Sequence, residues 1–99
     1  MQALRAEEHH VADARALLGA IPELAHLRAR RRAEFVVIES GPADDPIKHA
    51  RLRRVAVHLW TLDAATHRGQ WQPTGLRGRL DQLINALVAD FGWLLTPIA

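Results

Sequence analysis

The clearest pattern in the chain is an apolar stripe near its C-terminal end. Its members recur at the i, i+4, i+7 and i+8 spacing of one helix face. They are Leu76, Leu80, Leu83, Ile84, Leu87, Val88 and Phe91. The stripe predicts a last helix whose central apolar residues are buried, and Gly92 is typical of its end.

A thinner stripe of the same kind predicts a first helix over residues 2–18. Pro22 suits the first turn of a second, short helix, since the N–H that proline lacks has no partner there. Four arginines within residues 28–32 follow. We expect them at the end of this helix, where cations meet the negative pole of the helix dipole.

The middle of the chain favours sheet. Residues 33–39 are apolar at both alternating sets of positions, which predicts a central strand covered on both faces. GPADDP at 41–46 has the composition of a loop. A β-branched run at 52–62, a break at 63–66 and a short run at 69–72 predict a β-hairpin that carries Trp60 and Trp71.

Together these elements predict an α+β fold in the order α-α-β-β-β-α. The sheet has three to four mainly antiparallel strands, and the helices pack on one of its faces. Residues 93–98, WLLTPI, form either a further edge strand or an apolar tail, and Pro97 argues against a central strand there.

Composition narrows the class of protein. With 99 residues and 48% hydrophobic content, we expect residues 1–99 to form a single small domain, for which a homodimer would bury additional surface. The absence of cysteine excludes disulfides and thiolate metal sites. No apolar run approaches the ~20 residues of a membrane helix, and the first ten residues do not resemble a signal peptide. We therefore expect a soluble, cytoplasmic protein of bacterial type.

Charge changes this picture only slightly. The pI is near 10.4, yet the net charge is only +2, because Lys48 is the sole lysine among 13 basic residues. High arginine, alanine and leucine content also follows from a GC-rich genome. On the predicted hairpins the basic residues fall at both ends of the sheet, which weakens the case for a single nucleic-acid groove.

The segment PTGLRGRLD at 73–81 is the most suggestive polar feature. It places Arg77 and Arg79 at the start of the last helix, with Arg68 approaching from the hairpin. Helix N–H groups, two glycines (Gly75 and Gly78) and three guanidinium groups would form an anion site. The alternative is that these arginines pair with nearby aspartates on a solvated surface. Residues 75–78 resemble the GxxG loop of KH-type RNA-binding domains, although that loop joins two helices and this one follows a strand.

Two aromatic residues and a histidine of the hairpin are candidates for a partner or ligand surface: Trp60, Trp71 and His58. The predicted turn would bring the two tryptophans onto one sheet face, where they would stack on bases or fill a partner's pocket. The alternative is that both lie in the core beneath the last helix.

Catalytic and metal-binding chemistry have weaker support. His9 and Asp13 are one helical turn apart, which suits half a metal site, but no matching His or Cys pair occurs elsewhere. His58 and His67 flank Asp63 without an evident nucleophile, since Ser40 is the only serine. We predict no catalytic residue, no metal and no cofactor.

The leading hypothesis is a non-enzymatic binding or assembly module that acts through a homodimer or a partner-protein surface. The second is a nucleic-acid or phosphate-ligand binder that uses the arginines at the start of the last helix. A small histidine-dependent enzyme is the third.

Overall fold

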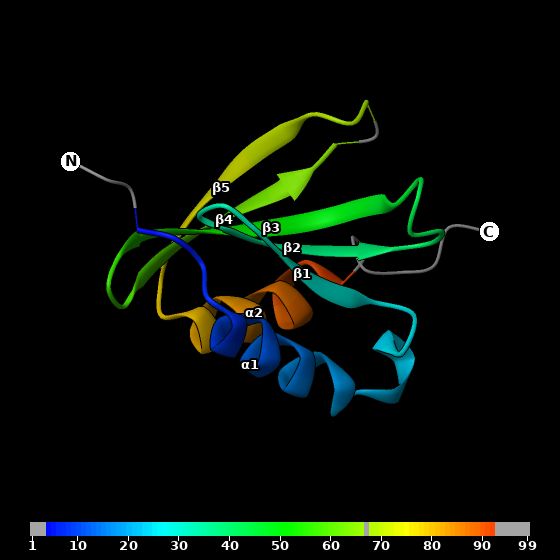
Figure 1. Ribbon diagram of the computed structural model, residues 1–99, viewed down its shortest axis with the longest axis horizontal. Coiled ribbons are helices and arrows are strands. Elements are labelled where there is room, and N and C mark those ends of the chain that lie inside the picture. The colour runs from blue at the N-terminus through cyan, green and yellow to red at the C-terminus, as the bar shows by residue number, and fades with distance from the viewer. Residues whose placement is uncertain (1–3, 67, 93–99) are drawn as a thin grey trace.

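A computed structural model describes residues 4–66 and 68–92 of the chain. The strands follow one another in an antiparallel meander, so their order in the sheet is their order in the sequence (Figure 1). The elements are α1 (Glu8–Gly19), the 3-10 helix η1 (Pro22–Leu24), β1 (Arg28–Arg32), β2 (Phe35–Ser40), β3 (Ile47–Ala56), β4 (Leu59–Ala65), β5 (Trp71–Gly78) and α2 (Leu80–Asp90). The α+β class is confirmed, with five strands among the described residues where three to four were predicted.

The first additional strand is β1, which the sequence analysis placed at the end of a helix. Its five residues are Arg-Ala-Arg-Arg-Arg, and only Ala29 is buried. This composition carries no apolar alternation that would predict a strand. Pairing with β2, from Arg28 opposite Glu39 to Arg32 opposite Phe35, supplies the hydrogen bonds that define it.

The second additional strand appears because the predicted strand over 52–62 contains a turn. β3 ends at Ala56 and β4 begins at Leu59, so Val57 and His58 form the reversal. No glycine, asparagine or proline occurs there to predict a turn. Instead, Arg54 donates hydrogen bonds from Nε and Nη2 to the Val57 carbonyl, at 3.2 and 3.0 Å.

The predicted third strand over 69–72 is also longer than expected. β5 runs from Trp71 to Gly78, and α2 begins only at Leu80. The GxxG segment of residues 75–78 is therefore part of a strand, so the resemblance to a KH loop does not hold. Pro73 is tolerated because β5 lies at the edge of the described sheet.

One core lies between the helices and the sheet (Figure 1). Both helices lie along the same side of the sheet in this view, and α1 contacts β1 while α2 contacts β4 and β5. The prediction that Leu83, Ile84 and Leu87 are buried is confirmed, while Val88 is half-buried against the same core.

Helix α1 begins at Glu8 rather than at residue 2. Its start is fixed by a capping box, in which the backbone N–H of Glu7 donates to Nδ1 of His10 at 2.9 Å. The predicted tail or strand at 93–98 lies outside the described residues. Within the described part of the chain, neither helix is long and apolar enough to cross a membrane.

Candidate functional site

The sheet face opposite the helices gathers basic side chains. Strand register places them in three rows that cross the sheet, because paired residues of antiparallel strands point to the same face. The rows are Arg28–Glu39–Lys48, then Arg30–Val37–Arg51–Asp63–Pro73, then Arg32–Phe35–Arg53–Thr61–Arg77. We call this surface the arginine face, defined by Arg28, Arg30, Arg32, Lys48, Arg51, Arg53 and Arg77.

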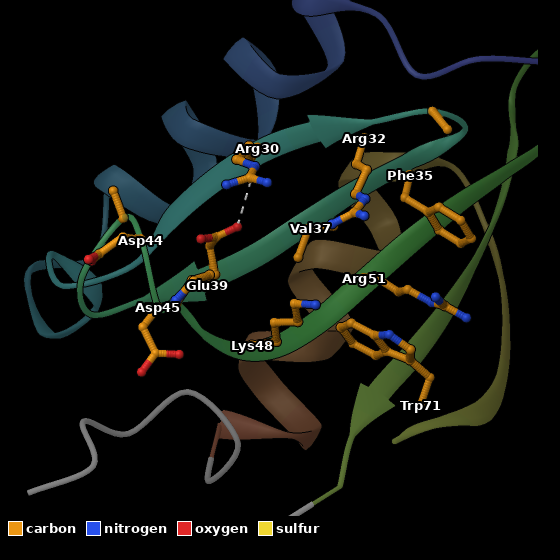
Figure 2. Close-up of a pocket in the computed structure, with 13 residues that line it drawn as sticks. Arg30, Arg32, Phe35, Val37, Glu39, Asp44, Asp45, Lys48, Arg51 and Trp71 are labelled. Atoms are coloured by element: carbon orange, nitrogen blue, oxygen red, sulfur yellow. Dashed lines mark ion pairs between the residues drawn. The ribbon is translucent and has the colours of Figure 1, made fainter. Parts of the chain in front are cut away.

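A hollow of about 640 Å³ lies on the arginine face (Figure 2). Arg30 and Arg32 line it from β1, and Arg51 and Trp71 line it from the far side. One end is acidic, because Asp44 and Asp45 of the β2–β3 loop also line it. Positive charge is therefore concentrated toward the end of the hollow where β1 turns into β2.

The centre of this surface is a stack of planar groups. Figure 2 shows the Arg51 side chain between Phe35 and Trp71. Its guanidinium carbon lies 4.3 Å from the centroid of the Phe35 ring and 4.6 Å from that of Trp71. Nε of Arg51 also donates to Oδ2 of Asp63 at 2.8 Å. Two cation–π contacts and one ion pair hold this guanidinium in place.

A buried carboxylate organises the neighbouring row. Glu39 is 1% exposed and lies 3.0 Å from Nη2 of Arg28 and 3.8 Å from Nε of Arg30. A buried charge is tolerated only when it is paired in this way. The two carboxylates within the three rows, Glu39 and Asp63, are thus matched by neighbouring arginines. No ion pair among the described residues includes Arg32, Lys48 or Arg77.

The structure does not bring together the arginines of the site predicted at the start of the last helix. Arg68 lies in the turn beyond the Ala65–Trp71 pair, whereas Arg77 and Arg79 lie at the opposite end of the β4–β5 hairpin. Of the two glycines, Gly75 is exposed in β5 with a φ of +83° and Gly78 ends that strand.

Arg79 is paired locally. Its Nε and Nη2 donate to the two carboxylate oxygens of Asp81 at 3.2 and 3.1 Å. This hydrogen-bonded guanidinium lowers the pKa of the exposed Asp81 carboxyl. The pairing of an arginine with a nearby aspartate, which the sequence left open, is therefore present at Arg79.

The tryptophans of the predicted partner surface lie on opposite faces of the sheet. Trp60 is 2% exposed in the core, and its ring meets the His10 ring edge-on at 4.9 Å. Trp71 is half-buried on the arginine face. The prediction that they share a face is wrong, because β4 continues to Ala65 and Trp71 pairs with Ala65, whereas Trp60 pairs with Gly78. Trp60 and Ala65 are an odd number of residues apart in β4, so they point to opposite faces. His58 is exposed in that turn.

A second hollow, of about 540 Å³, is lined by three of the five described histidines. His9, His10 and His58 line it, and ligand atoms of Glu7, His9 and His10 lie within 4.8 Å of one another. However, the one lone pair of a neutral His10 ring accepts the Glu7 N–H, so a metal there would have to break the helix cap.

The structure also brings together a serine and a histidine whose contact the sequence did not predict. Oγ of Ser40 and Nε2 of His49 lie 2.7 Å apart. A β-bulge at Ile38–Glu39 brings them together, and such an irregularity has no signal in the sequence. A serine next to a histidine is the usual form of an activated nucleophile. Here, however, the two residues are only 6% and 3% exposed, so a substrate would reach Oγ only if the sheet opened.

The proposed acid–base set around the hairpin has no support from geometry. Asp63 is held by Arg51, and His67 lies outside the described residues.

Comparison with known proteins gave no match: no family model, curated protein or solved structure is significantly similar to this chain.

Proposed function

We propose that this protein is a non-enzymatic binding module and that its arginine face binds nucleic acid. The observation that carries the proposal is the concentration of basic residues on the sheet face that no helix of the described residues covers. The three rows contain seven basic residues and two carboxylates, while the whole chain has a net charge of only +2.

Phosphate contacts supply most of the affinity of a non-specific nucleic-acid binder. Arg32, Lys48 and Arg77 are free of carboxylate partners among the described residues, so their charge is available to phosphates. These cations lie on β1, β3 and β5 of the five-stranded sheet, whose strands are about 4.8 Å apart, which gives an extended surface and not a point site. Such a surface suits a charged polymer.

The test is binding of a fluorescently labelled oligonucleotide, followed by anisotropy at several salt concentrations. We expect binding that weakens as salt rises, and we expect Arg32→Gln and Arg77→Gln each to reduce the salt slope by about one unit. Arg15→Gln, which removes an exposed charge from α1, is the matched control and should leave the slope unchanged. No binding at low salt, or an equal effect of all three variants, would refute the proposal.

The same assay separates the arginine face from the site predicted at the start of the last helix. Arg77 belongs to both, whereas Arg79 belongs only to the predicted helix-start site and is already paired with Asp81. We expect Arg79→Gln to have a smaller effect than Arg32→Gln. The reverse order would favour the helix-start site.

Self-association is the second candidate function. It is favoured by Val55 and Val57, which are 40% and 54% exposed at the β3–β4 turn. Large apolar side chains that are exposed at the same turn favour an interaction surface there. The arginine face does not suit this role, because two copies placed face to face would repel each other. Light scattering, which measures the mass of the species in solution, tests this candidate.

A further inference from the structure

The aromatic residues of the described chain are divided between the two faces of the sheet. Trp60 and Phe91 pack with the core on the helix side. Phe35 and Trp71 lie on the arginine face, each partly exposed. Phosphate binding alone does not require large apolar rings. An exposed ring also presents apolar surface to water, which is unfavourable.

The rings are also held in fixed positions. Both contact the same guanidinium, that of Arg51, at 4.3 and 4.6 Å, and Asp63 anchors that guanidinium through a 2.8 Å hydrogen bond. The two rings and the guanidinium therefore form one preorganised group near the centre of the sheet. Planar groups of these two kinds are the ones on which unpaired bases stack.

Cations surround this group within reach of a bound chain. Arg32 lies beside Phe35 on β1, and Arg53 lies beside it on β3. Toward the opposite edge of the sheet, on the same face, Arg77 lies in the same strand as Trp71. A nucleic-acid strand that placed bases on the rings would thus have guanidinium groups near its phosphates on both sides.

We propose that the ligand of the arginine face is single-stranded nucleic acid and that Phe35, Arg51 and Trp71 form its base-stacking platform. This inference rests on the proposed function, since it specifies the form of nucleic acid bound at the same surface. The bases of a duplex are paired and stacked on one another, so they cannot lie on the rings. The platform therefore selects single strands over duplexes and over polyanions without bases.

The test compares three ligands at one salt concentration: a single-stranded oligonucleotide, the same sequence as a duplex, and inorganic polyphosphate. We expect the single strand to bind most tightly. Phe35→Leu and Trp71→Leu should each weaken single-strand binding by about five- to 100-fold, which is the usual range for one stacked base. The same variants should leave polyphosphate binding unchanged. Circular dichroism of each variant verifies that it remains folded.

Arg32→Gln is the matched electrostatic control, and it should weaken all three ligands together. Trp71 supplies a second readout, because stacking of a base quenches tryptophan emission. This quenching should disappear in Trp71→Leu although Trp60 and Trp93 remain. DNA and RNA versions of the single strand show which sugar the surface accepts, and tighter binding of either one supports the proposal.

The two proposals fail in different ways. If no ligand binds at low salt, the proposed function itself is wrong. If all three ligands bind equally and the leucine variants have no effect, the arginine face binds polyanions, and the stacking platform is refuted.

Discussion

His10 shows how one residue joins a helix cap to the core. Its Nδ1 accepts the Glu7 N–H at the start of α1, and its ring packs edge-on against Trp60. Burial is the main cause that lowers the pKa of His10 below its ordinary value of 6.5, with further contributions from His9 and Arg54. The neutral ring is the form that the cap requires, because a protonated Nδ1 cannot accept.

A pH dependence of stability follows from this lowered pKa. In the unfolded chain the pKa of His10 is near its ordinary value of 6.5, whereas in the folded chain its pKa is lower. Above pH 6.5, His10 should therefore not reduce the free energy of unfolding. As the pH falls below 6.5 toward the lower pKa of the folded state, the free energy of unfolding should decrease, because the unfolded chain binds the proton more readily. Chemical denaturation at pH 7.5 and 5 measures the loss.

The comparison for His10 is His10→Asn, whose side-chain oxygen still accepts the Glu7 N–H but does not titrate. We expect the parent to lose more stability than this variant between the two pH values. Equal losses would show that His10 does not contribute to the pH dependence.

Among the elements, α2 has the most regular apolar face, and the structure buries it. Leu83, Ile84 and Leu87 are at most 3% exposed and contact the sheet face that carries Trp60 and Leu62. This helix covers β4 and β5, whereas α1 covers β1. The two helices together close the core on one side of the sheet.

We expect Leu87→Ala to lower the free energy of unfolding by about 2–5 kcal/mol, because truncation of a buried leucine removes apolar burial and leaves a cavity. Asn85→Ala, on the exposed side of the same helix, is the control and should change stability by less than about 0.5 kcal/mol. Urea denaturation monitored by circular dichroism provides both values. If Leu87→Ala unfolds at the urea concentration of the parent, the helix packing described here is incorrect.

The five-stranded sheet has helices on one face and a charged surface on the other. On the charged face, the guanidinium of Arg51 packs against Phe35 and Trp71, and both rings stay partly exposed. The largest exposed apolar side chains of the described residues instead include Val55 and Val57, at the tip of the β3–β4 hairpin.

We expect this tip to mediate a homodimer. Light scattering at tens of micromolar should then give twice the mass of one chain. Val57→Ser should shift the equilibrium toward the monomer, because it removes apolar surface from the contact. Ala89→Ser, on the exposed side of α2, should not. A monomer mass at every concentration would exclude self-association through this surface.

Several elements of this protein could be predicted from local patterns of residues. Helical spacing predicted α2 and its buried leucines, proline predicted the start of η1, and turn composition predicted the loop at 41–46. Apolar alternation also predicted the sheet strand at 33–39, which the structure places at Phe35–Ser40 as β2. In each case the residues that signal the element lie within a few positions of one another.

The arginine face could not be predicted in this way, because strand pairing brings its residues together from distant parts of the chain. β1 is a strand because it pairs with β2, and its Arg-Ala-Arg-Arg-Arg sequence has no local preference that would show this. The turn at Val57–His58 depends on hydrogen bonds from the Arg54 side chain. The register of β4 with β5, in which Trp71 pairs with Ala65, places Trp60 and Trp71 on opposite faces. Phe35, Arg51 and Trp71 come from three different strands, so their contact depends on register across the sheet, which hydrophobic periodicity alone does not specify.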